Sequence, residues 1–223
     1  MDWIIICLAA GIGYLLGSIS GAIIVSRAFN KSDIRSHGSG NAGATNMLRS
    51  FGAKSALLTV CIDLLKGFLA CGLGGLLVHF CGGRFGYTEG VCIAGAFAVI
   101  GHNWPIFFGF KGGKGVLTAL AVMLMISPLA AVSALVLFII IVVITRYVSL
   151  GSIIAAFSVP GFTALFLFLF GKPVISVSFF VSVFLAILII VRHHSNIGRL
   201  IHGNENKLSF KNKEASDDNS SEK

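Results

Sequence analysis

The chain has 223 residues, of which 56% are hydrophobic and 12% are charged. A soluble domain carries about 25% charged residues, so this composition excludes an ordinary soluble protein and indicates one embedded in a membrane. The net charge is +8, but the Lys and Arg residues lie between apolar runs and near the C-terminal end. A nucleic-acid-binding protein would present a basic face on a polar segment, and the sequence contains no such segment.

Seven apolar runs follow one another along the chain, and each is predicted to be a helix. They lie at residues 3–25, 54–80, 88–102, 115–127, 128–145, 151–170 and 173–191. The first run has no basic segment before it and exceeds the hydrophobic part of a signal peptide, so we expect it to remain as a membrane helix. The runs at 88–102 and 115–127 are shorter than the ~20 residues that a perpendicular span needs.

The boundary between the fourth and fifth runs depends on Pro128, which cannot continue a helix without a kink. If the chain turns there, 14 basic residues lie on one side of the membrane, and Arg84 and Lys172 lie on the other. If 115–145 is one kinked helix, the basic residues divide 8 to 8. Inner loops carry the excess of Lys and Arg. The sequence therefore predicts an all-α, seven-transmembrane-helix bundle with its N-terminus outside and its C-terminus in the cytoplasm.

We expect residues 1–208 to form a single membrane domain. In this topology the loops 26–53, 103–114 and 146–150 and the C-terminal segment all face the cytoplasm. Residues 209–223 are polar with one Phe and are expected to form a disordered tail.

The first of these loops contains the segment GSGNAGATN at 38–46. Its small residues allow backbone amides to approach an anion. The hydroxyl and amide donors that it supplies are the side chains of Ser39, Asn41, Thr45 and Asn46. Arg49 follows one helical turn after Asn46, and a guanidinium suits bidentate binding of phosphate. The alternative is a flexible turn with Arg49 as a basic anchor at the membrane surface.

The second loop ends in the pentad KGGKG at 111–115. Lys111 and Lys114 bring two ammonium groups to a backbone loosened by Gly112, Gly113 and Gly115. The pentad directly precedes an apolar helix, whose N-terminus adds amide donors and partial positive charge. These features predict a phosphate site. The pentad is not a Walker A loop, because Gly follows Lys114. The alternative is a basic turn that holds lipid head groups.

Polar residues also follow the fifth and seventh runs. Ser149 belongs to a short inner turn that carries little information by itself. His193 and Asn196 share one face if the last helix continues inward, and His193 could serve as a base or orient a substrate. The alternative is an ordinary polar helix end.

Asp63 and Lys66 lie well inside the second apolar run. Ionisable residues within a membrane are functional candidates, but their i, i+3 spacing equally suits a neutralising structural pair, which we favour. We also favour a structural role for His102. The five Cys are expected to be reduced. The His and carboxylate residues form no ligand set, so we expect no metal and no cofactor.

Together these segments resemble one family, the bacterial acyl-phosphate:glycerol-3-phosphate acyltransferases (PlsY family). The matching pieces, in order, are GS at 17–18, GSGNAGATN at 38–46 with Arg49, DLLKG at 63–67, GHNWPIFFGFKGGKGV at 101–116, RYVSLGSI at 146–153, and RHHSNIGRL at 192–200 with Gly203 and Glu205. The series covers residues 3–208, and its order makes the resemblance specific.

The resemblance implies a seven-helix enzyme of the bacterial inner membrane with a cytoplasmic active site. Such an enzyme moves a fatty acyl group from acyl phosphate to the 1-hydroxyl of glycerol 3-phosphate, giving lysophosphatidic acid and phosphate, the first step of phospholipid synthesis. The polar active-site residues that it implies are Ser39, Arg49, Lys111, Ser149, His193 and Asn196, with phosphate bound at Gly112, Gly113 and Gly115 and a structural role for Glu205. The donor's own phosphate would act as the base.

Two other functions remain open. A transporter of an anionic phosphorylated metabolite would place its polar groups at the membrane midplane, whereas here they gather in the predicted inner loops. A non-catalytic lipid-binding scaffold would not require so many small polar residues. The sequence contains no G-x-S-x-G elbow of the serine hydrolases.

Overall fold

The computed structural model describes residues 2–208, which form nine α-helices and two short 3-10 turns. The α-helices are α1 (Asp2–Gly17), α2 (Gly21–Asn30), α3 (Ala44–Cys81), α4 (Tyr87–Asn103), α5 (Val116–Ile126), α6 (Pro128–Thr145), α7 (Val148–Leu169), α8 (Val177–Arg192) and α9 (His194–Ile201). The 3-10 turns are Ile34–Ser36 and Ile106–Phe108. The tail predicted at 209–223 lies outside the described residues.

Five segments among the described residues are long and apolar enough to cross a membrane, and α8 with α9, bent by 57°, would make a sixth. The prediction of an all-helical membrane protein is confirmed. Helix α5 has 11 residues and is therefore about 17 Å long, well short of the ~30 Å hydrocarbon core. The count of seven spans stays a prediction.

The chain reverses direction between α5 and α6, as the charge pattern predicts. Helix α5 ends at Ile126, and Pro128 is the first residue of α6. A single straight helix from 116 to 145 would hold its ends about 45 Å apart. Instead, Val116 at the start of α5 and Val148 at the start of α7 line the same cavity. The break at Pro128 is a turn rather than a kink.

Two predicted boundaries are wrong. The first apolar run is not one helix, because the chain leaves helical geometry between Gly17 and Gly21, where the free carbonyl of Ile19 accepts a hydrogen bond from Lys66 Nζ at 2.9 Å. The loop 26–53 is not all loop, because α3 begins at Ala44. Gly52 interrupts α3 with φ 82°, a conformation that favours glycine, so residues 44–51 form a separately oriented first piece of this helix.

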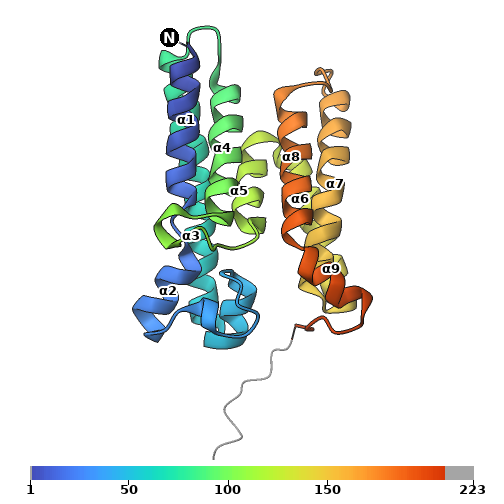
Figure 1. Ribbon diagram of the computed structural model, residues 1–223. Helices are drawn as coiled ribbons and strands as arrows, with labels where there is room; N and C mark the ends of the chain where they lie inside the picture. Colours follow the sequence, from blue (N-terminus) through green and yellow to red (C-terminus); the bar gives the residue numbers. More distant parts are fainter. Residues whose placement is uncertain (1, 209–223) are drawn as a thin grey trace, which may run out of the picture.

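The helices form two groups. Figure 1 shows α1, α3, α4 and α5 on one side and α6, α7 and α8 on the other. Glycines bring α1 against α4: a Cβ added at Gly13 or Gly17 would lie about 2 Å from the carbonyl oxygen of Ala94 or Ala98. A shared apolar core that includes Val122 of α5, Ala156 of α7 and Leu185 of α8 joins the two groups.

The polar segments gather in the half of the bundle that lies away from the N-terminus (Figure 1). There a second apolar cluster, which includes Ile23, Ile34, Ala42 and Met47, packs the first loop against α2 and α3. This packing fixes the backbone that carries the candidate site.

Candidate active site

A cavity of about 280 Å³ lies where the four polar segments meet. Of the residues predicted from the sequence, those that line it are Ser39, Asn41, Thr45, Asn46, Arg49, Lys114, Gly115, Ser149, His193 and Asn196. These residues come from the first loop and the start of α3, the KGGKG pentad, the start of α7 and the α8–α9 junction. The structure thus brings residues of all four segments to one cavity.

Lys111, Gly112 and Gly113 are not among the residues that line this cavity. The side chain of Lys111 is exposed. The amides of Gly112 and Gly113 donate to the carbonyls of Asn103 and His102, at 3.3 and 3.1 Å. A Cβ at Gly112 would lie 2.0 Å from the His102 carbonyl oxygen, and one at Gly113 would lie 2.2 Å from His102 Nε2. Close packing therefore requires both glycines, and their role in phosphate binding stays a prediction.

The first loop takes its shape from the buried side chain of Asn46. Its Nδ2 donates to the carbonyls of His37 and Asn41, at 3.0 and 3.1 Å, and its Oδ1 accepts from the Ser39 amide at 3.1 Å. Gly38 has φ 54°, and a Cβ there would lie 2.3 Å from Asn46 Oδ1. Asn46 thus holds the loop in the form that presents the exposed Ser39 hydroxyl to the cavity.

A network of charged and polar side chains forms one wall of the cavity. Lys114 Nζ donates to Asn196 Oδ1, and Asn196 Nδ2 donates to Glu205 Oε1 at 2.8 Å. Arg199 Nε donates to Glu205 Oε2 at 2.7 Å, and Arg49 Nη2 donates to the Asn206 carbonyl at 2.9 Å. Arg199 was missed by the sequence analysis, because Glu205 lies beyond the end of α9 and an i, i+6 spacing does not indicate a contact.

These contacts set the charges of the wall. Burial alone would raise the pKa of Glu205, but hydrogen bonds from Arg199 and Asn196 outweigh it, so the pKa is lowered and the carboxylate is ionised. Burial lowers the pKa of Lys114 to about 8; Glu205 opposes this shift, and the nearby guanidiniums add to it. Lys114 is therefore a cation at neutral pH that an anion in the cavity would stabilise.

Two further polar side chains of the wall, Ser149 and His193, can bond to a ligand. Ser149 Oγ is buried next to the Glu205 carboxylate, whose pKa it helps to lower. His193 is 3% exposed, and its Nδ1 lies 2.8 Å from the Ile189 carbonyl oxygen. A carbonyl can only accept, so Nδ1 carries the proton in the neutral ring and Nε2 keeps a lone pair. His193 can therefore accept a hydrogen bond from a bound hydroxyl.

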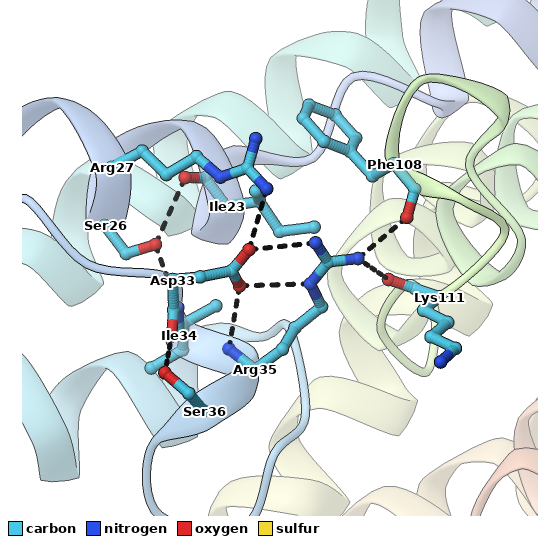
Figure 2. Close-up of polar contacts among 9 residues, drawn as sticks. All are labelled: Ile23, Ser26, Arg27, Asp33, Ile34, Arg35, Ser36, Phe108 and Lys111. Carbon is cyan, nitrogen blue, oxygen red and sulfur yellow. Dashed lines mark hydrogen bonds and ion pairs between the residues drawn. The ribbon is translucent and has the colours of Figure 1, made fainter.

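Two guanidiniums hold the loop that precedes α5. Figure 2 shows Arg35 donating to the carbonyls of Phe108 and Lys111, at 2.7 and 3.4 Å, while the Lys111 ammonium points away. On another side of the loop, Arg192 Nη2 donates to the Gly113 carbonyl at 3.0 Å. Asp33 orients Arg35 through bonds of 2.8 to 3.0 Å, and the hydrogen bond from Arg35 holds the pKa of Asp33 well below its usual range. The loop is thus fixed through its carbonyls.

A second cavity of about 120 Å³ continues from the first between α5, α6, α7 and α8. Val116, Leu117, Phe138 and Ser152 line both. The second is otherwise lined by aliphatic residues such as Leu120, Leu135 and Leu185. The pair of cavities suits a molecule with an anionic head and an apolar chain. Among residues 2–208, no three His, Cys, Asp or Glu side chains lie close enough together to hold a metal ion.

The chain is therefore a helical membrane protein in which a cation-lined cavity adjoins an apolar one. The sequence also matches the family model described as glycerol-3-phosphate acyltransferase over residues 6–203. The chain belongs to this family.

Known proteins support the assignment. The glycerol-3-phosphate acyltransferase of Halalkalibacterium halodurans is 45% identical, with 89% of this chain and 93% of that protein covered. That of Finegoldia magna is 39% identical, with 93% and 98% covered. The crystal structure of PlsY, an integral membrane glycerol 3-phosphate acyltransferase, in its glycerol 3-phosphate form has a TM-score of 0.78 and is 38% identical, with 92% of this chain and 96% of that chain covered. Its lysophosphatidic acid form has a TM-score of 0.75.

The two arginines that contact Asp33 provide a matched test of the loop clamp. Arg27 contacts Asp33 at 2.8 Å, as Arg35 does, but its side chain is 53% exposed, and the two carbonyls of the loop bond to Arg35. Arg35→Met should therefore speed hydrogen exchange at the amides of Gly112 and Gly113 by about tenfold or more, since charged hydrogen bonds contribute about 1.5–3 kcal/mol. Arg27 lies over the Phe108 ring, 5.8 Å from its centroid, but bonds to neither carbonyl, so Arg27→Met should change these rates by about twofold or less. Equal exchange rates in both variants would contradict the clamp.

Proposed function

We propose that this protein transfers a fatty acyl group from acyl phosphate to the 1-hydroxyl of glycerol 3-phosphate, producing lysophosphatidic acid and inorganic phosphate. The observation that carries the proposal is the cation-lined cavity that opens into an apolar one. The names of the related structures add support, because PlsY is described in a glycerol 3-phosphate form and in a lysophosphatidic acid form. These are the acceptor and the product of the proposed reaction.

The proposed reaction has two requirements, alignment of the reactants and stabilisation of negative charge. Acyl phosphate is a mixed anhydride with a good leaving group, so the protein must align the reactants and stabilise negative charge. In our proposal Arg49 and Lys114 bind phosphate inside the cavity, helped by the amides at the N-terminus of α5. Lys111 lies outside the cavity lining and is exposed, so its side chain must turn toward the cavity to bind the second phosphate, while the hydroxyls of Ser39 and Ser149 bind the substrates.

The proposed reaction transfers the acyl group and the hydroxyl proton in one step. The 2-hydroxyl of glycerol 3-phosphate donates a hydrogen bond to His193 Nε2, which orients the neighbouring 1-hydroxyl oxygen toward the carbonyl carbon of acyl phosphate and leaves the 1-hydroxyl proton free for the phosphate. The new C–O bond forms as the bond from that carbon to the phosphate oxygen breaks. The departing phosphate takes the hydroxyl proton. Asn196 keeps Lys114 and Glu205 in place during the transfer.

The apolar cavity is the proposed site of the acyl chain. It lies beside Val116 and Leu117, the first residues of α5, which also line the polar cavity. A chain that enters from the bilayer exchanges one apolar environment for another, so van der Waals packing in this cavity would hold the carbonyl group at the boundary between the two cavities.

The distribution of charge supports the membrane arrangement. We propose seven spans in the inner membrane within one domain of residues 1–208, with the N-terminus outside and the cavity at the cytoplasmic face. Helix α5 would then be a short span whose first turn lies below the membrane surface. The runs of Lys and Arg in the four cavity-forming segments support this orientation.

The first test uses the purified protein in detergent. With acyl phosphate and glycerol 3-phosphate as the additions, and without acyl-CoA, acyl carrier protein or metal, we expect lysophosphatidic acid and phosphate to form in equal amounts. Mass spectrometry and a phosphate assay measure the two products. Absence of lysolipid, together with counterflow of glycerol 3-phosphate in proteoliposomes, would favour the transporter instead.

Alanine substitution of three basic residues tests the proposed phosphate contacts. Arg49→Ala and Lys111→Ala should each lower turnover by about 100-fold or more, the cost of removing a charge-stabilising donor, and leave a monodisperse protein. Lys54, which is exposed on α3 and is not among the residues that line the cavity, is the matched control, and Lys54→Ala should keep turnover within about twofold. Normal turnover in both test variants would mean that the site is misplaced.

The pKa of Lys114 predicts a pH dependence. Its pKa of about 8 means that the binding cation is lost as pH rises through 8, while a phosphomonoester, with a second pKa of about 6, stays a dianion. Calorimetry should show the dissociation constant for glycerol 3-phosphate rising by about tenfold between pH 7 and pH 9. In Lys114→Arg this rise should largely disappear, because Arg remains charged. The same rise in both proteins would contradict the assignment.

A further inference from the structure

Three buried polar residues at the cavity wall take no part in the mechanism above. Asp63 and Lys66 of α3 and His102 of α4 are 1%, 3% and 4% exposed. Asp63 and His102 also line the polar cavity. The ion pair that the sequence analysis favoured is present, with Lys66 Nζ 2.8 Å from Asp63 Oδ1, and His102 joins it as a third member.

The Lys66 ammonium has three N–H donors and contacts three acceptors. These are Asp63 Oδ1 at 2.8 Å, the Ile19 carbonyl oxygen at 2.9 Å and His102 Nδ1 at 2.7 Å. An ammonium cannot accept a hydrogen bond, so His102 Nδ1 must be the acceptor. A neutral lysine would leave the buried Asp63 carboxylate without its cation, which is costly. His102 Nδ1 lies 3.6 Å from Asp63 Oδ1, too far for a hydrogen bond.

The proton of the neutral His102 ring is therefore on Nε2. This atom lies beside the pentad, since a Cβ at Gly113 would be 2.2 Å from it. The hydrogen bond between His102 and Lys66 is made at Nδ1 and leaves Nε2–H available to a ligand. His193, on the same cavity, has the opposite tautomer, because its Nδ1 bonds to the Ile189 carbonyl. One histidine thus offers the cavity an acceptor and the other offers it a donor.

We propose that His102 is a further substrate-binding residue, whose Nε2–H donates a hydrogen bond to a phosphoryl oxygen in the cavity. Asp63 and Lys66 are positioning residues that hold its ring in the donor tautomer. The inference rests on the proposed function for the identity of the phosphoryl group, which belongs either to glycerol 3-phosphate or to acyl phosphate. A neutral donor binds either without adding charge to the cationic wall.

Two substitutions at His102 separate the donor from the bulk of the ring. Glutamine can place an amide N–H near the position of Nε2, whereas leucine fills similar space without a donor. We expect His102→Leu to lower kcat/KM by about 10- to 100-fold, the range for a hydrogen bond to a charged group, and His102→Gln to keep it within about tenfold. A KM effect on one substrate identifies the phosphoryl group that is bound, and either substrate supports the proposal.

The tautomer of His102 and its response to phosphate can be measured, and a purely structural role for His102 predicts no response to phosphate. Asp63 and Lys66 also bond to the break between α1 and α2, so loss of turnover in Lys66→Met would not be decisive. Nitrogen-15 spectra of histidine-labelled protein, with the His102 signals assigned from their absence in His102→Gln, should show a protonated Nε2 and an unprotonated Nδ1. Inorganic phosphate should shift the Nε2 signal. In Lys66→Met, Nδ1 should become partly protonated.

The outcomes distinguish this proposal from the proposed function. If the wild-type protein makes no lysolipid, the proposed function fails, while the phosphate-dependent shift of His102 Nε2 still decides the inference. If the wild-type protein is active, either a protonated Nδ1 or unchanged kcat/KM in a folded His102→Leu variant overturns the inference. If His102→Leu does not fold, the tautomer and its response to phosphate decide the question.

Discussion

The candidate site depends on holding several cations together in a partly buried space. Glu205 makes this possible, because it bonds directly to Arg199 and through Asn196 to Lys114. Like charges repel strongly where solvent is scarce, and one carboxylate among several guanidiniums and an ammonium leaves the wall positive. The remaining charge is suited to an anion. Burial lowers the pKa of Lys114 and the neighbouring guanidiniums add to this shift, so a bound anion would stabilise its charged form.

Hydrogen bonds to backbone carbonyls fix the two loops that carry the polar residues of the cavity. Arg35 and Arg192 donate hydrogen bonds to carbonyls of the loop that contains the pentad. Asn46 donates hydrogen bonds to carbonyls of the first loop. Both loops lie on helices that glycines bring into close contact. The polar residues therefore sit on segments that are bonded on several sides, so a bound substrate need not order them, and less binding energy is lost to conformational entropy.

The sequence predicted the parts of the structure that hydropathy and charge determine. The helices, the turn at Pro128 and the convergence of four polar segments all follow from the bilayer as solvent. The direction of a side chain inside a glycine-rich loop cannot be predicted from hydropathy and charge, because it depends on contacts with residues far away in the sequence. Arg35 bonds to the Lys111 carbonyl, a contact between residues 76 positions apart, and the Lys111 side chain is exposed. The contact between His102 and Lys66 is also hard to foresee from the sequence, since the two residues are 36 positions apart.

The short α5 has a consequence for how a lipid would reach the site. Figure 1 shows α3 and α6 extending past the first turn of α5, so the positive end of this helix lies recessed behind its neighbours. An amphiphile in the adjoining leaflet could bring its head group down to that level while its hydrocarbon tail stays among other hydrocarbon. No tail carbon would have to cross water to enter or leave. Exchange with the surrounding lipid would then be lateral, and the leaflet itself would act as the reservoir for both the donor and the finished lysolipid.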